Sequence, residues 1–394
     1  MIRNIDWISI IIHHTDLLTD NMNLEKLPTP SLLLDKEKLM ANVARMQASA
    51  DRLGVALRPH LKTLKSAQAA EALIAAGASG ITVSTLKEAA YFLDNGFKDI
   101  TYAVGMVPAR LPEVIELMAR GADLKIMTDS VTVASEIARL SDQNRVSFQL
   151  LIEIDCGDHR GGLQADSDEL IQIAQIIEPS AARLEGILTH AGHSYGVDTT
   201  AAIATVAQQE RDSIVLAASR LGEAGYPVNT VSLGSTPTAL YAEDLSGVTE
   251  MRAGVYTVFD MDQQSRGVCT TDEIALSVLT SVIGHNKAAG KILLDAGGLA
   301  LSKDRSADRF RPEVGYGQLC HLHGAIIPEL YVTSVSQEHG HVTVRDERDF
   351  TLFPVGSQLR VLPVHACMTA AAYDYFNLIE AGVISGQWQR VNGW

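Results

Sequence analysis

Between residues 55 and about 255 the chain alternates two kinds of segment. Short runs of Val, Ile, Leu and Thr, typical of buried strands, are followed by longer Ala-rich stretches whose apolar residues recur at intervals of three and four, as on one face of a helix. This alternation predicts parallel strands joined by helical crossovers. The eight predicted strands are residues 55–61, 80–84, 99–104, 123–128, 148–155, 184–190, 229–234 and 249–256.

Eight is the number of strands that closes a (β/α)8 barrel, so we predict an α/β fold built on a TIM-type barrel. An open, doubly wound parallel sheet is the alternative that the same alternation allows. After about residue 271 the pattern changes to strand-like pieces separated by turns, with few helical stretches. This change predicts a second, mostly β domain.

The same patterns divide the chain into three parts. Residues 1–27 are polar and irregular and predict an N-terminal arm, whose one apolar run is too short to cross a bilayer. Residues 39–271 are assigned to the barrel and residues 272–394 to the β domain. A short apolar strand precedes the first long helix and is expected to pair with the C-terminal strands, so residues 28–38 join the β domain.

Composition and charge exclude several classes of partner. The chain has 32 basic and 47 acidic residues and a formal charge of −15, which disfavours nucleic acid and anionic membranes. Its four cysteines follow no spacing typical of a disulfide framework, so we expect reduced thiols. We therefore predict a cytoplasmic protein that acts on a small molecule. A homodimer is our expectation for its assembly.

Polar residues gather at the carboxyl ends of the predicted strands, where barrel enzymes carry their functional groups. Lys62 follows the first strand, and a lysine that loses its hydration there can act as a Schiff-base nucleophile or take up a proton. A solvated surface lysine is the commoner case. His190 ends the sixth strand, and His159 and Arg160 follow the fifth; each histidine could instead be a core residue bonded to a carbonyl.

A turn of small residues, Gly234, Ser235 and Thr236, follows the seventh strand and precedes a short predicted helix. Its N–H groups and hydroxyls would suit an anion, and the loops after the last two strands are the usual phosphate site of this fold. A capped helix without a ligand is the alternative. Gly254 and Tyr256, after the eighth strand, offer a close backbone approach and a hydroxyl. Together they predict a phosphorylated cofactor.

His365 and Cys367 stand two residues apart, so both side chains would leave the same face of an extended strand. Imidazole and thiolate suit zinc, and two protein ligands leave positions open for water and substrate. Manganese, cobalt and nickel are alternatives at such an open site. A buried cysteine that only packs is the simplest alternative to a metal ligand.

Nine segments, taken in order, resemble the D-serine dehydratase-like family of pyridoxal-phosphate enzymes, of which the D-threonine aldolases are relatives. The resemblance runs from about residue 29 to residue 394. It implies an alanine racemase-like barrel that carries pyridoxal 5'-phosphate, a β domain and a divalent metal. The segments are RPHLKT, GASGITVSTLKEA, YAVGMVP, EIDCGDHRGG, LTHAGHSY, LGSTPTAL, GVTEMRAGVY, SQEHG and PVHACMT.

The resemblance also assigns roles to single residues. It implies that Lys62 is the Schiff-base lysine, that Arg160 contacts the cofactor's phenolic oxygen, and that His365 and Cys367 bind the metal. Where many relatives read K-T-H-K, this chain has Leu64, which removes a polar group near the lysine. The implied cofactor and phosphate contacts are Tyr195, Ser235, Thr236, Gly254 and Tyr256, with Thr85 near the ring; His190 and Gly234 complete the candidate cofactor site.

The activity implied by the resemblance is elimination of water from 3-hydroxy D-amino acids, with Lys62 as the base at Cα. D-threo-3-hydroxyaspartate would give oxaloacetate and ammonia, and D-serine would give pyruvate and ammonia. Retro-aldol cleavage to glycine and an aldehyde is the alternative; Cys367 favours elimination, because the aldolases usually have Asp as the second ligand. A non-catalytic pyridoxal-phosphate carrier would be a bare barrel, and residues 271–394 argue against it.

Overall fold

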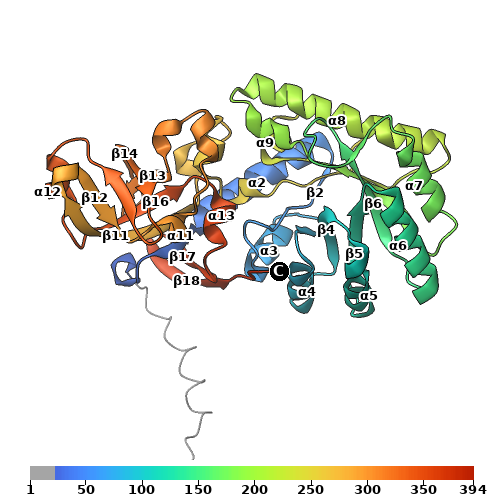
Figure 1. Ribbon diagram of the computed structural model, residues 1–394, viewed down its shortest axis with the longest axis horizontal. Helices are drawn as coiled ribbons and strands as arrows, with labels where there is room; N and C mark the ends of the chain where they lie inside the picture. The colour runs from blue at the N-terminus through green and yellow to red at the C-terminus, as the bar shows by residue number, and fades with distance from the viewer. Residues whose placement is uncertain (1–22) are drawn as a thin grey trace, which may run out of the picture.

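The computed structural model describes residues 23–394, so the expectations for residues 1–22, which cover most of the predicted arm, lie outside the described residues. The described chain forms two domains side by side, a parallel sheet surrounded by helices and an antiparallel β domain (Figure 1). The predicted fold class, a (β/α)8 barrel followed by a mostly β domain, is confirmed.

The first domain is a parallel sheet of eight strands in the order β2-β10-β9-β8-β6-β5-β4-β3. A parallel bridge between His60, just after β2, and Thr82 in β3 joins the two ends of this order. The sheet therefore closes into a barrel, which excludes the open doubly wound sheet. Each predicted strand overlaps one of the observed strands: β2 (Ala56–Leu57), β3 (Ile81–Val83), β4 (Asp99–Gly105), β5 (Asp123–Thr128), β6 (Gln149–Asp155), β8 (Arg183–Thr189), β9 (Thr230–Leu233) and β10 (Glu250–Met251), with a short β7 (Leu163–Gln164) beside β6.

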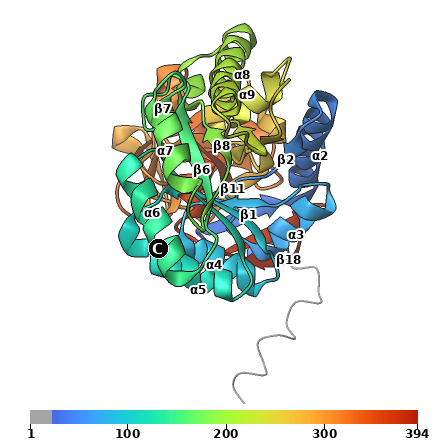
Figure 2. The same cartoon turned by 90° about the vertical axis from the view of Figure 1, so that its right-hand side faces the viewer.

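Helices cover the outside of the barrel, as the view from its side shows (Figure 2). In α6 the buried residues Ala134, Ile137, Ala138 and Ser141 repeat at three and four, which is the pattern that packs one helix face against a sheet. No described helix is long and apolar enough to span a membrane. The helices are α3 (Ala67–Ala75), α4 (Leu86–Asp94), α5 (Leu111–Ala119), α6 (Val131–Asn144), α7 (Glu169–Ile177), α8 (Thr200–Glu223) and α9 (Thr236–Tyr241).

The second domain is a sheet in the order β12-β15-β14-β13-β16-β11-β1-β17-β18, in which β12 also pairs with β11. Six of its strands thus close a second, antiparallel barrel, and β1, β17 and β18 extend it. The strands are β11 (Leu276–Asn286), β12 (Lys291–Leu294), β13 (Gly317–His321), β14 (Ile326–Val335), β15 (Gly340–Thr343), β16 (Gln358–Pro363), β17 (Tyr375–Glu380) and β18 (Val383–Gln389), with the short helices α10 (Met261–Ser265), α11 (Gly298–Leu301), α12 (Arg348–Leu352) and α13 (Ala366–Ala370).

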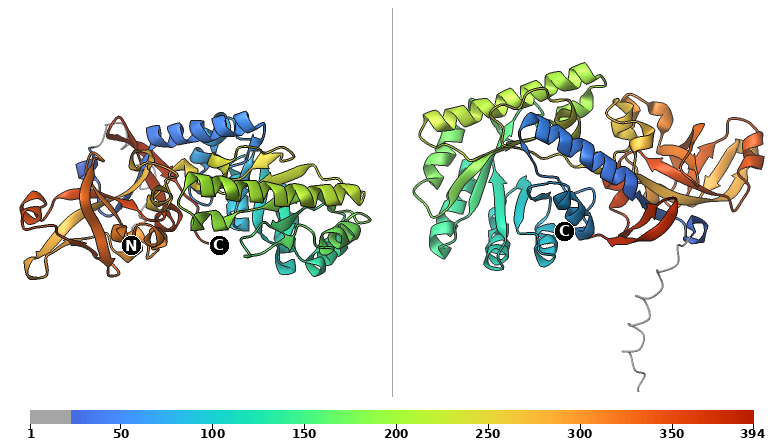
Figure 3. Two further views of the ribbon diagram at one scale, coloured as in Figure 1. Left: turned by 90° about the horizontal axis from the view of Figure 1, so that it is seen from above. Right: turned by 180° about the vertical axis from the view of Figure 1, so that it is seen from behind.

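The strand that precedes the barrel, β1 (Ser31–Asp35), belongs to the β domain. It pairs antiparallel with β11 and parallel with β17. Leu24 and Leu27, which the sequence pattern assigns to the arm, are buried against Leu33 in a small apolar cluster of this domain. Helix α2 (Lys36–Leu53) then carries the chain across to the barrel (Figure 3).

Candidate active site

A cavity of about 560 Å³ lies where the carboxyl ends of the barrel strands face the β domain. Loops of the barrel form one part of its wall, and the segment around α13 with the loop after α11 forms another. Thr85, His159 and Tyr256 are the candidate residues that do not line it. The predicted residues that the cavity brings together are Lys62, Arg160, His190, Tyr195, Gly234, Ser235, Thr236, Gly254, His365 and Cys367.

Two neighbouring lysines differ in what their amines contact. Lys62 is exposed to the cavity from the turn that follows β2, and so it is not desolvated as the sequence argument assumes. Lys65 lies in the same turn, but its Nζ is 3.0 Å from Oε1 of the fully buried Glu88. The ion pair occupies the Lys65 amine, so Lys62 is the amine that a ligand in the cavity would meet.

His190 forms an uncharged wall of the cavity. Its Nδ1–H donates to the carbonyl oxygen of Gly234 at 3.0 Å, as the core-histidine alternative proposes, yet the ring lines the cavity. Burial, assisted by the nearby Lys62 charge, lowers the pKa of His190 to about 3, so the imidazole is neutral. The ring of Tyr195 lies 6.4 Å from it, centroid to centroid, so two aromatic surfaces face this part of the cavity.

The loops that carry His190 and Ser235 are attached to helix α8 by one buried carboxylate. Oε1 of Glu210 accepts the backbone N–H of Ala191 at 2.9 Å and that of Gly234 at 3.0 Å. Burial raises the pKa of Glu210, while these N–H donors oppose the rise. Sequence reasoning missed this residue, because a Glu within a long helix is usually a surface residue.

The turn after β9 is both a capped helix start and part of the cavity wall. Ser235 Oγ accepts from the backbone N–H of Thr238 at 3.3 Å and caps α9. Thr236 Oγ1 accepts from the backbone N–H of Tyr256 at 3.1 Å. The Tyr256 hydroxyl is fully buried and has no hydrogen-bond partner among residues 23–394. A buried hydroxyl without a partner is costly, and an anionic ligand beside it would remove that cost.

The glycines of these loops also serve loop packing. A Cβ on Gly254 would lie 2.7 Å from the carbonyl oxygen of His60, so a side chain would force the loops after β10 and β2 apart. Gly234 has φ +126°, a backbone conformation that L side chains rarely adopt. Both residues still present their backbone to the cavity.

Three predicted positions near β3 and β6 take different roles. Thr85 Oγ1 accepts from the backbone N–H of Glu88 at 3.0 Å and caps α4, and its neighbour Ser84 lines the cavity in its place. The His159 ring is exposed and bonded to Asp155 at 2.8 Å, outside the cavity wall. Arg160 lines the cavity with a largely exposed guanidinium.

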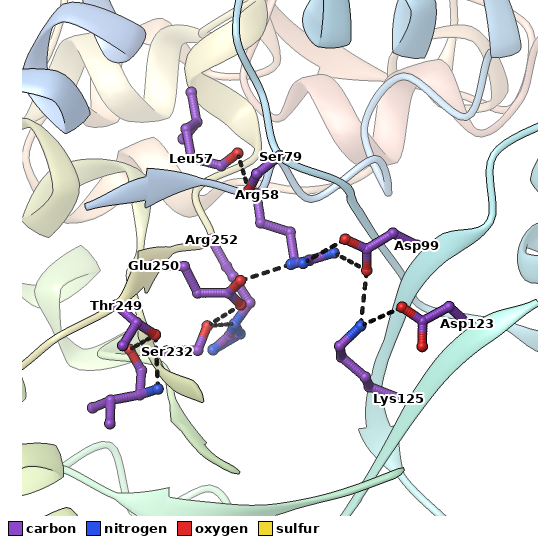
Figure 4. A network of polar contacts seen from close by, with 11 residues as sticks. Leu57, Arg58, Ser79, Asp99, Asp123, Lys125, Ser232, Thr249, Glu250 and Arg252 are labelled. Atoms are coloured by element: carbon purple, nitrogen blue, oxygen red, sulfur yellow. Dashed lines mark hydrogen bonds and ion pairs between the residues drawn. The ribbon is translucent and has the colours of Figure 1, made fainter. Parts of the chain in front are cut away.

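A network of buried polar groups inside the barrel ends at Arg252, a cavity residue that sequence reasoning also missed (Figure 4). Arg58 bonds both oxygens of Asp99, at 2.8 and 2.9 Å, and its Nε donates to Glu250 at 2.8 Å. Ser232 Oγ donates to the same Glu250 at 2.7 Å and accepts from Arg252 Nε at 2.8 Å. The chain of contacts therefore fixes a cation in the wall of the cavity.

The H-x-C pair converges, but not as two side chains of one strand. Strand β16 ends at Pro363; His365 is the N-cap of α13, and Cys367 lies within that helix. Although burial opposes it, hydrogen bonds to Asp304 and Cys367 raise the pKa of His365 to about 11. Burial also opposes the lowering of the Cys367 pKa, but the hydrogen bond from His365 outweighs it. The two groups therefore form a pair in which His365 favours the thiolate form of Cys367.

The residues of the pair fit a divalent metal. His365 Nδ1 bonds Asp304 Oδ2 at 2.8 Å, which leaves Nε2 on the side of Cys367; metal-binding histidines are usually oriented by a carboxylate in this way. A metal would displace the imidazole proton and bind Cys367 as a thiolate, the form that the neighbouring imidazole favours. Within residues 23–394 no group of three or more His, Cys, Asp or Glu side chains is placed to hold a metal.

The rest of the cavity fits pyridoxal phosphate. An exposed primary amine, three guanidinium groups, neutral aromatic rings and the hydroxyl turn after β9 suit an anionic aromatic aldehyde. The backbone N–H of Tyr256 contacts that turn, and its buried hydroxyl has no partner among residues 23–394, which agrees with a further acceptor such as a phosphate oxygen.

Comparison with known proteins matches each of the two domains to a known family. Residues 34–262 match the family described as alanine racemase, N-terminal domain, and residues 275–379 match the one described as putative serine dehydratase domain. The D-threo-3-hydroxyaspartate dehydratase of Delftia sp. (strain HT23) is 46% identical over 93% of this chain and 98% of that enzyme. The D-serine dehydratase of Dictyostelium discoideum is 30% identical over 92% of this chain and 95% of that enzyme.

The structures agree with the sequences. The solved structure of the Delftia dehydratase has a TM-score of 0.93 at 45% identity, over 95% of this chain and 100% of that one. A variant of the same dehydratase has been solved in a metal-free form. The two family matches together span both domains of the present structure. The chain therefore belongs to the D-serine dehydratase-like family, in which an alanine racemase N-terminal domain is followed by a serine dehydratase domain.

Proposed function

We propose that this chain is a lyase that eliminates water from 3-hydroxy D-amino acids, with pyridoxal phosphate and a divalent metal as cofactors. The observation that carries the proposal is that one cavity holds the exposed amine of Lys62 together with the His365–Cys367 pair. Elimination needs a base at Cα and an acid at the hydroxyl of the next carbon, and these are the two groups that the cavity supplies. The two dehydratase relatives support the same reaction.

Different residues of the chain would bind the cofactor and transfer the proton. Lys62 would hold the cofactor covalently and, once a D-amino acid has displaced it, take the Cα proton on Nζ. The cofactor supplies an electron sink for the carbanion. Ser235, Thr236 and Tyr256 would hold its phosphate, and Arg160 its phenolic oxygen. The neutral His190 would add no charge beside the ring.

His365 and Cys367 would hold the metal, which acts as a Lewis acid on the 3-hydroxyl. Asp304 keeps the imidazole oriented through Nδ1. The C3–O bond breaks and hydroxide leaves with the proton that Lys62 removed, so one water is lost. The enamine product then takes up one water and gives a 2-oxo acid and ammonia: oxaloacetate from D-threo-3-hydroxyaspartate, and pyruvate from D-serine.

A substrate panel with separate assays for ammonia and for aldehyde tests the proposal. We expect D-threo-3-hydroxyaspartate, and more slowly D-serine, to release ammonia in step with the 2-oxo acid, and the L-enantiomers to be inert. D-threonine should yield little glycine or acetaldehyde. If glycine and aldehyde matched or exceeded ammonia, retro-aldol cleavage would replace elimination as the function.

The proposal also covers the cellular compartment and the oligomeric state of the enzyme. The four cysteines are free thiols, which supports a reducing compartment such as the cytoplasm. The homodimer stays a prediction, which sedimentation of the purified chain would check.

A further inference from the structure

Arg390, which follows β18, contacts the turn that presents Lys62. Its side chain is buried, with 7% of its surface exposed. Nε donates to the carbonyl oxygen of Leu64 at 3.0 Å, and Nη2 donates to that of Thr63 at 3.2 Å. The C-terminus lies beside α3 and α4 of the barrel (Figure 1). A residue of the β domain is thus attached to backbone one and two positions beyond the candidate cofactor lysine.

The same guanidinium also contacts the end of α13, the helix that contains Cys367. Nη1 donates to the carbonyl oxygens of Ala370 and Tyr373, the latter at 2.7 Å. Burial lowers the pKa of Arg390 to about 10, so the group keeps its charge at neutral pH. A guanidinium has five N–H donors in one rigid plane, and here they reach carbonyls of both domains at once.

A second, direct contact lies beside this bridge. Thr63 Oγ1 is 2.9 Å from Cys367 Sγ, so the residue after Lys62 touches the candidate metal ligand. The turn and the helix are therefore joined at two places, once by backbone carbonyls through Arg390 and once by side chains.

We propose that Arg390 is a positioning residue that sets the separation between Lys62 and the His365–Cys367 pair. The inference rests on the proposed function, in which a base and a metal act on neighbouring carbon atoms. The two centres then work across a single C–C bond, where a misplacement of about 1 Å costs on the order of 100-fold in rate. Arg390 bonds both the turn that carries Lys62 and the backbone at the end of α13, the helix that contains Cys367.

The test compares Arg390→Met with Arg360→Met. Arg360 is a matched control, because it is equally buried at 7% exposure but bonds Ser277 within the β domain. Both variants are loaded with pyridoxal phosphate and with zinc or cobalt(II), and bound metal and visible absorption are measured. Cobalt(II) quenches the fluorescence of the bound cofactor with a strong dependence on distance, so quenching reports the separation without any turnover.

For Arg390→Met we expect near-normal loading with cofactor and zinc, weaker quenching by cobalt(II), and a kcat for elimination about 100-fold lower with little change in KM. Arg360→Met should keep both quenching and kcat. Arg390→Lys, which retains the charge but reaches fewer carbonyls, should recover part of both losses. If Arg390→Met does not fold, this milder variant carries the same comparison.

Unchanged quenching and kcat in Arg390→Met would overturn the proposal, and so would a fall in kcat that only follows loss of cofactor. Failure of the proposed function is seen separately, in the products of the unmodified chain. Release of glycine and aldehyde there would change the reaction, whereas the quenching comparison would still decide the role of Arg390.

Discussion

At the scale of single residues, the site depends on which polar groups are already paired within the chain. Glu88 occupies the amine of Lys65 and leaves Lys62 exposed to the cavity. The exposed lysine can exchange its bonds with a ligand at little cost, whereas the paired one would leave a buried carboxylate without its counterion. The ion pair with Glu88 thus distinguishes two lysines of the same turn: Lys65 is held within the fold, and Lys62 remains available to a ligand.

The first prediction concerns this pair of lysines. Lys62→Ala should abolish the visible absorption of the bound cofactor and reduce elimination by about four orders of magnitude or more, because the covalent attachment and the base are lost together. Lys65→Ala is the matched control and should keep the absorption. Borohydride reduction followed by peptide mapping would identify the modified lysine, and a cofactor trapped on Lys65 would refute the assignment.

The residue types and their order along the chain were enough to predict several of the polar residues of the cavity wall, because strand ends converge in a barrel. Hydrogen bonds that form only in the folded chain were not predictable. Thr85 was expected near the ring, but it caps α4. Arg252 was not predicted, because it reads as part of a strand and only the network through Ser232 shows where its guanidinium is held.

At the scale of secondary-structure elements, the ends of strands and helices determine where the chemistry lies. The predicted strand through His365 stops at Pro363, and α13 begins directly after it. The sequence pattern could not locate this boundary, because apolar residues continue through it and a five-residue helix has too few turns to show a period. His365 and Cys367 still lie close together, because the start of a helix also brings neighbouring side chains together.

The second prediction concerns the network at the start of the barrel strands. Asp99 begins β4; burial raises its pKa, but the hydrogen bonds and charges of Arg58 and Lys125 outweigh burial, and the pKa is lowered from 3.8. Its contribution to stability is therefore complete above pH 3.8 and is lost as the pH falls toward the lowered value. Asp99→Asn should reduce the free energy of unfolding by about 1–3 kcal/mol at neutral pH.

Urea denaturation at neutral pH and below pH 3.8 would measure this effect. The difference between Asp99→Asn and the unmodified chain should shrink in acid, because the parent carboxylate is then protonated as well. Asp94→Asn is the control, since Asp94 pairs with Arg120 on the surface with 65% of its side chain exposed. A pH-independent difference would mean that the Asp99 charge does not stabilise the barrel.

At the scale of the whole molecule, each domain holds one half of the candidate chemistry. Lys62 and the hydroxyl turn belong to the barrel, whereas His365 and Cys367 belong to the β domain. The two groups meet only because the barrel's strand ends face the second domain (Figure 1). The fold of each domain was predictable from local patterns, but their mutual placement depends on long-range contacts that no local pattern contains.

The third prediction follows from this division. A chelator, or the substitution Cys367→Ala, should abolish elimination but leave the visible absorption of the cofactor in place, because the proposed cofactor contacts lie in the barrel and not among the metal ligands. Loss of one of two protein ligands should weaken metal binding by at least about 100-fold, which zinc titration would measure. Cys320→Ala replaces a buried thiol outside the cavity wall and should retain both properties. Full activity in Cys367→Ala would contradict the prediction and would show that Cys367 is a packing residue rather than a metal ligand.

The pairing of β1 with β17 sets an order for biosynthesis. Within the barrel most strands pair with the next one along the chain, so each can dock soon after it leaves the ribosome. In β1, by contrast, the carbonyl of Leu32 receives a hydrogen bond from Asn377, 345 residues later. One edge of β1 stays unpaired until nearly the whole chain has emerged, which makes it a target for chaperones. The growing polypeptide thus completes the barrel with the candidate cofactor site first, and the candidate metal ligands His365 and Cys367 follow later.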